Sequence, residues 1–189
     1  MAGTMVLTNQ QIPMSFFSLQ NTFTKILLIT GLTFIIYSYL ARIIPIYFFW
    51  ESGYTGWMIA LVGVIGLFLT WIKRLRVQKK KTVLPKILIG IISFLLLLQA
   101  ILLIVLPRTD AYKAAKAFIR GNENIRKELG SIKGWAVIPI GSISVSTVNQ
   151  KTTGQANLVM IVKGENRFRR YVVNLVKDVD SDWKVYEFH

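Results

Sequence analysis

The sequence predicts an α+β protein in which three membrane-spanning helices precede a small domain of two helices and a four-stranded antiparallel sheet. Hydrophobic residues make up 53% of the 189 residues, and the mean hydropathy is +0.48, which is too apolar for an ordinary soluble globule. Most apolar residues precede Pro107, whereas charged residues gather around Lys79 and after Arg108. The chain therefore divides into an N-terminal segment (1–24), a membrane anchor (25–107) and a water-exposed domain (108–189).

Three apolar stretches are long enough to cross a bilayer. A hydrocarbon core of about 30 Å needs about 20 helical residues. We expect the spans at about 26–47, 56–72 and 87–106. Trp57 and Trp71 lie at the two ends of the second span, as expected for an interfacial aromatic belt.

Loop charge predicts the orientation of the anchor. The loop 73–86 between the second and third spans is basic, whereas the loop between the first and second spans has one acidic and no basic residue. Six basic residues lie between positions 73 and 81: Lys73, Arg74, Arg76, Lys79, Lys80 and Lys81. Such residues are enriched in cytoplasmic loops and attract anionic headgroups. We therefore expect residues 1–24 and 73–86 in the cytoplasm, and everything after Pro107 on the opposite side of the membrane.

Two features of the anchor have more than one interpretation. Arg42 lies inside the first predicted span, where a basic residue indicates a functional site by default. Its position near the end of that span instead favours snorkelling to the headgroups. The spacing of Gly56, Ala60 and Gly63 puts three small residues on one helix face, which lets another helix approach closely. That second helix belongs either to a partner or to the anchor itself.

Helical periodicity opens the C-terminal domain. Apolar residues recur at helical spacing in 110–121, and a shorter helix is expected at 123–129. Asp110 is the expected N-cap of the first helix. Gly121 and Asn122 are its expected left-handed stop.

From Trp135 the apolar period falls to two, which is typical of strands. Four strands are expected around 137–145, 156–162, 171–175 and 183–188, separated by turn-forming residues at 149–154, 164–166 and 178–182. No helix intervenes between them, which predicts an antiparallel sheet. We expect the two helices to pack on one of its faces.

A basic and aromatic cluster near the third strand is the candidate interaction site. It comprises Arg167, Phe168, Arg169, Arg170 and Tyr171. Such a cluster can meet an acidic partner, anionic headgroups or nucleic acid; the alternative is a charged strand end that faces water. Residues 108–189 contain fourteen basic and eight acidic residues, for a net charge of +6.

The sequence offers few residues for metal or acid–base chemistry. Cysteine is absent, and the one histidine is His189, so we expect no metal, no haem and no other cofactor. A Ser/His/Asp arrangement needs an internal histidine, although a hydroxyl with lysine as its base stays open. Asp178, Asp180 and Asp182 alternate like calcium ligands, but the glycine and glutamate of such loops are missing. A solvated turn is the favoured interpretation, and we expect no enzyme.

Several short motifs carry a family resemblance. They are Asn124-Ile125 through Leu129-Gly130, the strand motifs Gly154-Gln155-Ala156 and Val162-Lys163-Gly164, and a closing Trp183-Lys184-Val185. Over residues 110–188 the domain thereby resembles the cytochrome c oxidase assembly factor one family, whose domain is similar in fold to the intermembrane-space domain of presequence translocase subunit twenty-one. The resemblance implies a domain that binds oxidase subunits during assembly. Mitochondrial members have one membrane helix and this chain is expected to have three, which indicates a bacterial relative.

These observations lead to a functional expectation. We expect a non-enzymatic interaction or assembly factor of the bacterial inner membrane, with its domain in the periplasm; the mitochondrial inner membrane is the alternative location. The expected partners are membrane-complex subunits, with cytochrome oxidase first, and anionic headgroups, but not nucleic acid. The alternative function is an accessory subunit or docking module of another envelope complex, for secretion or transport. A membrane hydrolase is disfavoured by the lack of an internal histidine, of a cysteine and of a carboxylate pair near membrane depth.

Overall fold

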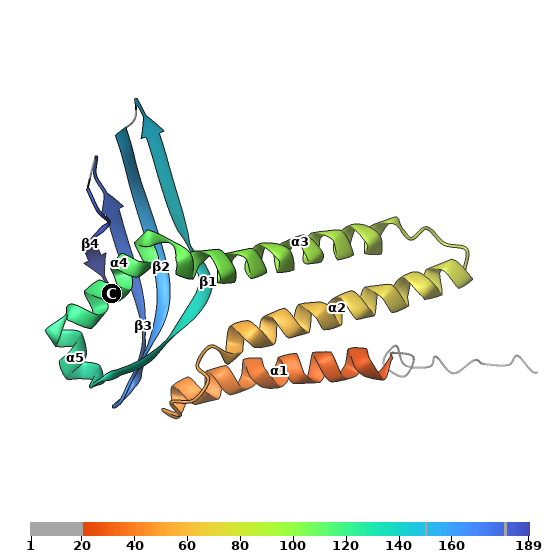
Figure 1. The fold of residues 1–189 in the computed structure, drawn as a ribbon. Coiled ribbons are helices and arrows are strands. Elements are labelled where there is room, and N and C mark those ends of the chain that lie inside the picture. The colour runs from red at the N-terminus through yellow and green to blue at the C-terminus, as the bar shows by residue number, and fades with distance from the viewer. Residues whose placement is uncertain (1–20, 150, 180) are drawn as a thin grey trace, which may run out of the picture.

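A computed structural model describes residues 21–149, 151–179 and 181–189, and within them it contains three long apolar helices. They are α1 (Thr22–Ile43), α2 (Ser52–Val77) and α3 (Val83–Val105). Each is long and apolar enough to cross a membrane, which confirms that the three expected stretches are long apolar helices. The helices alternate in direction, so the end of α1, the start of α2 and the end of α3 lie next to the sheet (Figure 1). Residues 1–20 of the predicted N-terminal segment lie outside the described residues.

The helix ends differ from the predicted ends for local reasons. The first helix stops at Ile43 rather than near residue 47. Pro45 excludes the helical conformation from the residue before it, and Ile44 is accordingly extended, with φ −96° and ψ 110°. The second helix continues to Val77, because the basic residues that end it are good helix formers. The loop predicted at 73–86 is therefore limited to residues 78–82.

A short 3₁₀ turn, η1 (Leu106–Arg108), connects α3 to the two helices of the domain. These are α4 (Asp110–Gly121) and α5 (Glu123–Leu129), as predicted. The expected N-cap was wrong by one residue: the Thr109 hydroxyl accepts a hydrogen bond from the backbone N–H of Tyr112. A threonine hydroxyl at this position satisfies an otherwise unpaired N–H of the first turn.

The expected left-handed stop after α4 is also wrong. Asn122 has φ −78° and caps the start of α5, where its side-chain oxygen accepts hydrogen bonds from Asn124 and Ile125. The two helices are so close in sequence that one residue ends the first and begins the second. A left-handed residue does follow α5, at Gly130 with φ +73°.

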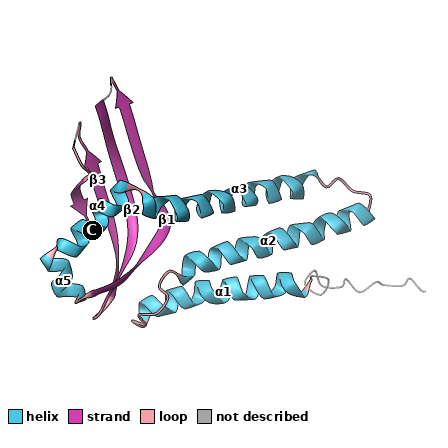
Figure 2. Cartoon of the chain, in the orientation of Figure 1, coloured by secondary structure: helices cyan, strands magenta, loops and turns pink. Residues whose placement is uncertain are grey.

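The four strands form one antiparallel sheet in the order β1-β2-β3-β4 (Figure 2). Their bounds are β1 (Ile132–Val148), β2 (Lys151–Gly164), β3 (Phe168–Lys177) and β4 (Lys184–Phe188). This confirms the predicted sheet, although β1, β2 and β3 are longer than expected. The β1–β2 register shifts between Val137 and Gly141, where Pro139 lacks an N–H for the ladder. Gly141 has φ +151°, and a Cβ there would lie 2.5 Å from the Asn157 carbonyl oxygen.

Each face of the sheet belongs to a different hydrophobic cluster. The first face, which includes Leu158, Met160, Val173 and Leu175, shares its cluster with buried residues of α4 and α5. The second face contributes a smaller cluster of buried residues, Ala136, Ile138, Val159 and Ile161. Partly buried Trp50 and Tyr54 pack against this smaller cluster. The second face is therefore completed by the membrane anchor.

Candidate interaction surface

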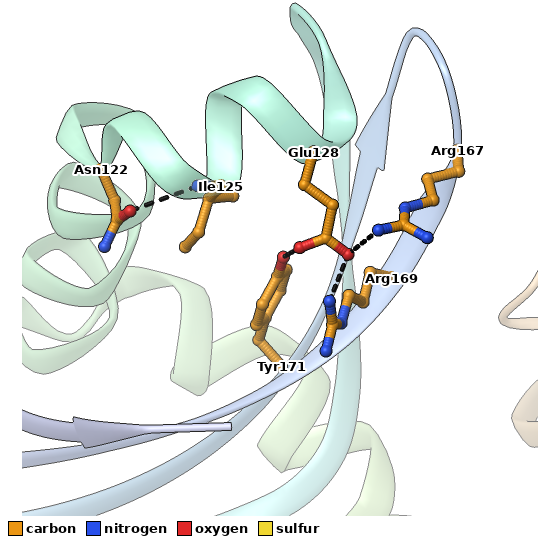
Figure 3. Close-up of polar contacts among 6 residues, drawn as sticks. All are labelled: Asn122, Ile125, Glu128, Arg167, Arg169 and Tyr171. Carbon is orange, nitrogen blue, oxygen red and sulfur yellow. Dashed lines mark hydrogen bonds and ion pairs between the residues drawn. The ribbon is translucent and has the colours of Figure 1, made fainter.

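Strand alternation divides the predicted basic and aromatic cluster between the two faces of the sheet. Successive side chains of a strand point to opposite faces. Arg169 and Tyr171 point toward α5 (Figure 3), whereas Phe168 stacks against aromatic rings of the anchor. Arg170 lies between Phe168 and Val172 of the second face and is exposed. The five residues therefore do not form one continuous surface.

Glu128 of α5 accepts hydrogen bonds from the polar side chains on the α5 side of the cluster (Figure 3). Arg167 and Arg169 both donate to its Oε1 atom, and the Tyr171 hydroxyl donates to Oε2 at 3.4 Å. The side chain of Glu128 is 21% exposed, whereas those of the two arginines are about half exposed. The neighbouring Leu129 is fully buried in the first-face cluster, which holds this turn of α5 against the sheet. We call Glu128, Arg167, Arg169 and Tyr171 the Glu128 node.

The charges of the Glu128 node support one another. Burial is the largest influence on Glu128 and raises its pKa, but Arg169, Arg167 and Tyr171 together outweigh burial, so the pKa lies below its usual value. The hydrogen bond to Glu128 raises the pKa of Arg169. Burial raises the pKa of Tyr171, and the Glu128 charge adds to that rise. Glu128 is thus ionised and neutralises part of the basic cluster, while Arg170 lies on the other face.

Contacts on the second face fasten the domain to the anchor. Lys163 Nζ lies 2.6 Å from Glu51 Oε1, and both side chains are about three-quarters buried. The Phe168 ring centroid lies 5.8 Å from that of Tyr47 and 6.0 Å from that of Trp50. The indole N–H of Trp50 donates to the Ile46 carbonyl at 3.0 Å, which fixes the loop before α2.

The Lys163–Glu51 pair was missed by the sequence analysis. The two residues are 112 positions apart, and no local period connects them. One signal was present: Glu51 is the only acidic residue before Asp110. A single acid at the end of a membrane span, in a chain of net charge +14, is a candidate partner for a distant base.

The small residues of α2 pack inside the anchor. A Cβ at Gly56 would lie 2.7 Å from the Gly31 carbonyl oxygen of α1, and a Cβ at Gly31 would lie 2.7 Å from the Ala60 nitrogen. A Cβ at Gly63 would lie 2.8 Å from the Leu28 side chain. The helix that packs against these small residues is thus α1, so they serve packing within the anchor. In contrast, a Cβ at Gly90 of α3 would meet nothing within 4 Å.

The six basic residues between positions 73 and 81 lie at the opposite end of the anchor from the sheet (Figure 1). Lys73, Arg74 and Arg76 belong to the last turns of α2, and Lys79, Lys80 and Lys81 follow in the short loop. All except Arg74 are exposed. These residues form a basic patch that is separate from the Glu128 node.

Arg42 lies in the last turn of α1, at the sheet end of the anchor, and is exposed. This position near the helix end is the one that favours snorkelling.

The carboxylates and the histidine are dispersed in the part of the chain that the structure describes, where no group of three or more potential metal ligands occurs. Asp178 belongs to a turn in which its backbone N–H donates to the Ser181 hydroxyl at 3.1 Å. Asp180 lies outside the described residues. His189 Nε2 lies 3.1 Å from Glu187 Oε1.

No protein-family model matches this chain, and neither does any curated protein or solved structure. The resemblance to the cytochrome c oxidase assembly factor one family therefore stays a prediction that rests on short motifs.

Proposed function

We propose that this chain is a membrane-anchored interaction or assembly factor that binds subunits of a multi-subunit membrane complex. The observation that carries the proposal is the attachment of the domain to the anchor. The Lys163–Glu51 ion pair and the packing of Phe168 on Tyr47 and Trp50 hold the sheet at one end of the helices. A membrane partner would therefore meet a domain of fixed orientation beside the bilayer.

Helix α3 supplies the membrane surface for such a partner. In the candidate spans of α1 and α2, 17% of the residues in the most apolar stretch are buried within the chain. In the span that contains α3 this share is 0%. Phe94, for example, is 64% exposed. Helices in membranes associate by close packing rather than by the hydrophobic effect, so an uncovered α3 next to the domain is suited to a partner helix.

The orientation that we propose puts the domain outside the cytoplasm. The basic patch lies at one end of the three helices and the domain lies at the other (Figure 1). Basic residues next to spans favour the cytoplasmic side. We propose a bacterial inner-membrane protein with a periplasmic domain, with the mitochondrial inner membrane as the alternative.

The identity of the complex rests on the family resemblance. We propose cytochrome oxidase, or respiratory-complex biogenesis more generally, and a non-enzymatic role. A docking module of a secretion or transport complex is the second candidate, because a domain fixed at the bilayer surface suits either complex equally well.

Affinity purification of the full chain in mild detergent tests the function. Haem–copper oxidase subunits among the co-purifying proteins would support the first candidate, and secretion or transport subunits would support the second. A protein that purifies alone in several mild detergents contradicts both.

Site-specific photocrosslinking sharpens this test. A photoreactive residue at Phe94 of α3 should capture a membrane partner more strongly than one at Ile29 of α1. Ile29 is a matched control because it is 59% exposed but belongs to a helix that is already paired with α2. Equal capture at both positions would remove α3 as the partner surface.

Fusion reporters test the orientation. Alkaline phosphatase is active only outside the cytoplasm, so a fusion after His189 should be active and one at Gln78 should be inactive. The reverse pattern would overturn the proposed topology.

A further inference from the structure

A cleft of about 260 Å³ opens where the membrane helices meet the sheet. Glu51, Tyr54 and Thr55 at the start of α2 supply polar groups to its wall. Its apolar wall includes Met58 of α2, Leu103 of α3 and Pro139 of β1. The cleft thus combines one charged residue with an apolar lining contributed by both the anchor and the sheet.

The two oxygens of the Glu51 carboxylate differ in their hydrogen bonding. Oε1 accepts from Lys163 at 2.6 Å. Oε2 is buried and has no hydrogen-bond partner among the described residues. A buried acceptor without a donor is unfavourable, and more so when the group is charged. The cleft is therefore suited to a cationic ligand that carries N–H donors.

The position of the cleft favours a lipid as the ligand. It lies at the ends of α2 and α3 that are next to the sheet, and the aromatic residues Tyr47, Trp50 and Tyr54 lie at this same end of the anchor. Aromatic residues of this kind mark the headgroup level of a bilayer. Met58 and Leu103 lie further than Glu51 from this end of the anchor, toward the apolar middle of α2 and α3. A headgroup at Glu51 would therefore have its acyl chains beside apolar helix surface.

We propose that this cleft binds a phospholipid with a primary ammonium headgroup, of the phosphatidylethanolamine class. Its ammonium donates to Glu51 Oε2, and one acyl chain passes Met58 and Leu103 between α2 and α3. A choline headgroup has no N–H to donate, and a glycerol headgroup has no cation for the carboxylate. Glu51 therefore selects the ethanolamine lipid over both.

Native mass spectrometry of the full chain tests the proposal. The protein is released from nanodiscs that contain equal amounts of phosphatidylethanolamine, phosphatidylcholine and phosphatidylglycerol with identical acyl chains. The wild type should retain the ethanolamine lipid about tenfold over the choline lipid, the ratio that corresponds to one charge-assisted hydrogen bond of about 1.4 kcal/mol. Glu51→Gln should bring this ratio close to one. Glu123→Gln, which makes the same change of charge at an exposed position of α5, should leave the ratio unchanged.

A second pair of variants keeps the proposal testable if Glu51→Gln fails to fold. Leu103→Trp fills the cleft and should abolish selective retention. Ile104→Trp adds the same ring to the next residue of α3, which is 55% exposed, and should retain the lipid. A wild-type ratio near one, or an unchanged ratio in Glu51→Gln or Leu103→Trp, would overturn the proposal. A carbodiimide crosslink between Glu51 and a lysine of a partner protein, without ethanolamine lipid in excess, would also overturn it.

Discussion

The two faces of the sheet are stabilised by different parts of the chain. The first face shares a large hydrophobic cluster with α4 and α5, to which the end of the anchor adds buried Leu106 and partly buried Leu102. The second face has a small cluster that is completed by Trp50 and Tyr54, which precede the domain by more than fifty residues of chain. The first face is therefore covered mainly by the domain's own helices, whereas the second face depends on residues of the anchor.

This difference gives the domain a defined attachment. A domain that buried both of its faces alone would need no contact with the membrane helices beyond its connecting peptide. Here the apolar side chains of the second face, together with Lys163, find their partners on the anchor. Changes to the first face should therefore unfold the domain, and changes to the second face should mainly release it from the anchor.

The largest effect is expected for a truncation in the first face. Leu175 is fully buried, so Leu175→Ala should lower the free energy of unfolding of the domain by about 2–5 kcal/mol, through lost burial and the cavity that remains. Denaturant unfolding of the detergent-solubilised chain measures this change. Val179→Ala, at a position that is 40% exposed, should change stability by less than about 0.5 kcal/mol. Similar losses in both variants would contradict the assignment of the core.

The next effect is expected within the anchor, which positions the residues that complete the second face. Gly56→Ala would bring a Cβ to 2.7 Å from the Gly31 carbonyl oxygen and 2.9 Å from the Ile35 nitrogen. Both contacts are to backbone, so the helices must separate, at a cost of about 1–3 kcal/mol. Faster hydrogen exchange in α1 and α2 should report this separation, while the first face stays protected. Gly90→Ala is the matched control, because its Cβ meets nothing within 4 Å. Faster hydrogen exchange in α3 of this variant would show that another helix packs against Gly90.

A smaller and more local effect is expected for Trp50. Its ring contacts Tyr47 and Phe168 and packs against the second-face cluster. Because the ring is only partly buried, Trp50→Ala should weaken the attachment by about 1–2 kcal/mol. Hydrogen exchange should rise in β2 near Ile161 and stay unchanged in α4. Trp57→Ala, at a residue that is 56% exposed on α2, should leave both segments unchanged, and a rise in α4 for Trp50→Ala would show that the faces are not independent.

Much of this architecture follows from periodicity, and the attachment does not. Apolar runs of membrane length and the alternation from Trp135 onward predicted the three long helices and the four strands, because each depends on neighbours in sequence. The capping error at Asp110 has a similarly local origin: Thr109 and Asp110 are both good caps, and only backbone geometry selects between them.

Contacts between distant segments left no comparable signal. The cluster from Arg167 to Tyr171 was identified by composition, but its division between two faces requires the exact start of β3, since a shift by one residue reverses every side chain. The Lys163–Glu51 pair depends on the position of the sheet relative to the anchor, and no periodicity in the sequence encodes that position. The partner of the Gly56, Ala60 and Gly63 stripe was similarly undecided, because spacing identifies a packing face but does not identify the helix that occupies it.

The smallest effect concerns the Glu128 node, which tests whether the charges on the first face act separately from the contacts that attach the second face to the anchor. The pKa of Glu128 lies below its usual value, so its ionised form is favoured by folding. Its contribution is present above the unfolded-state pKa of about 4.3 and is lost as the pH falls through the lower folded-state pKa. Because both arginines are about half exposed, Glu128→Gln should lower stability at pH 7 by only about 0.5–1 kcal/mol.

Unfolding of the wild type and of Glu128→Gln over a range of pH measures this contribution. The two free energies should differ at pH 7 and converge in acid, because a protonated glutamate and a glutamine are both neutral. Glu123→Gln, on the same helix but outside the node, should produce a smaller difference at pH 7. Hydrogen exchange at Ile161 should be the same in the wild type and Glu128→Gln, since Glu128 contacts the face that is opposite the anchor. A difference that persists unchanged in acid would show that the glutamine perturbs packing rather than charge, and faster exchange at Ile161 would show that the node also supports the attachment to the membrane helices.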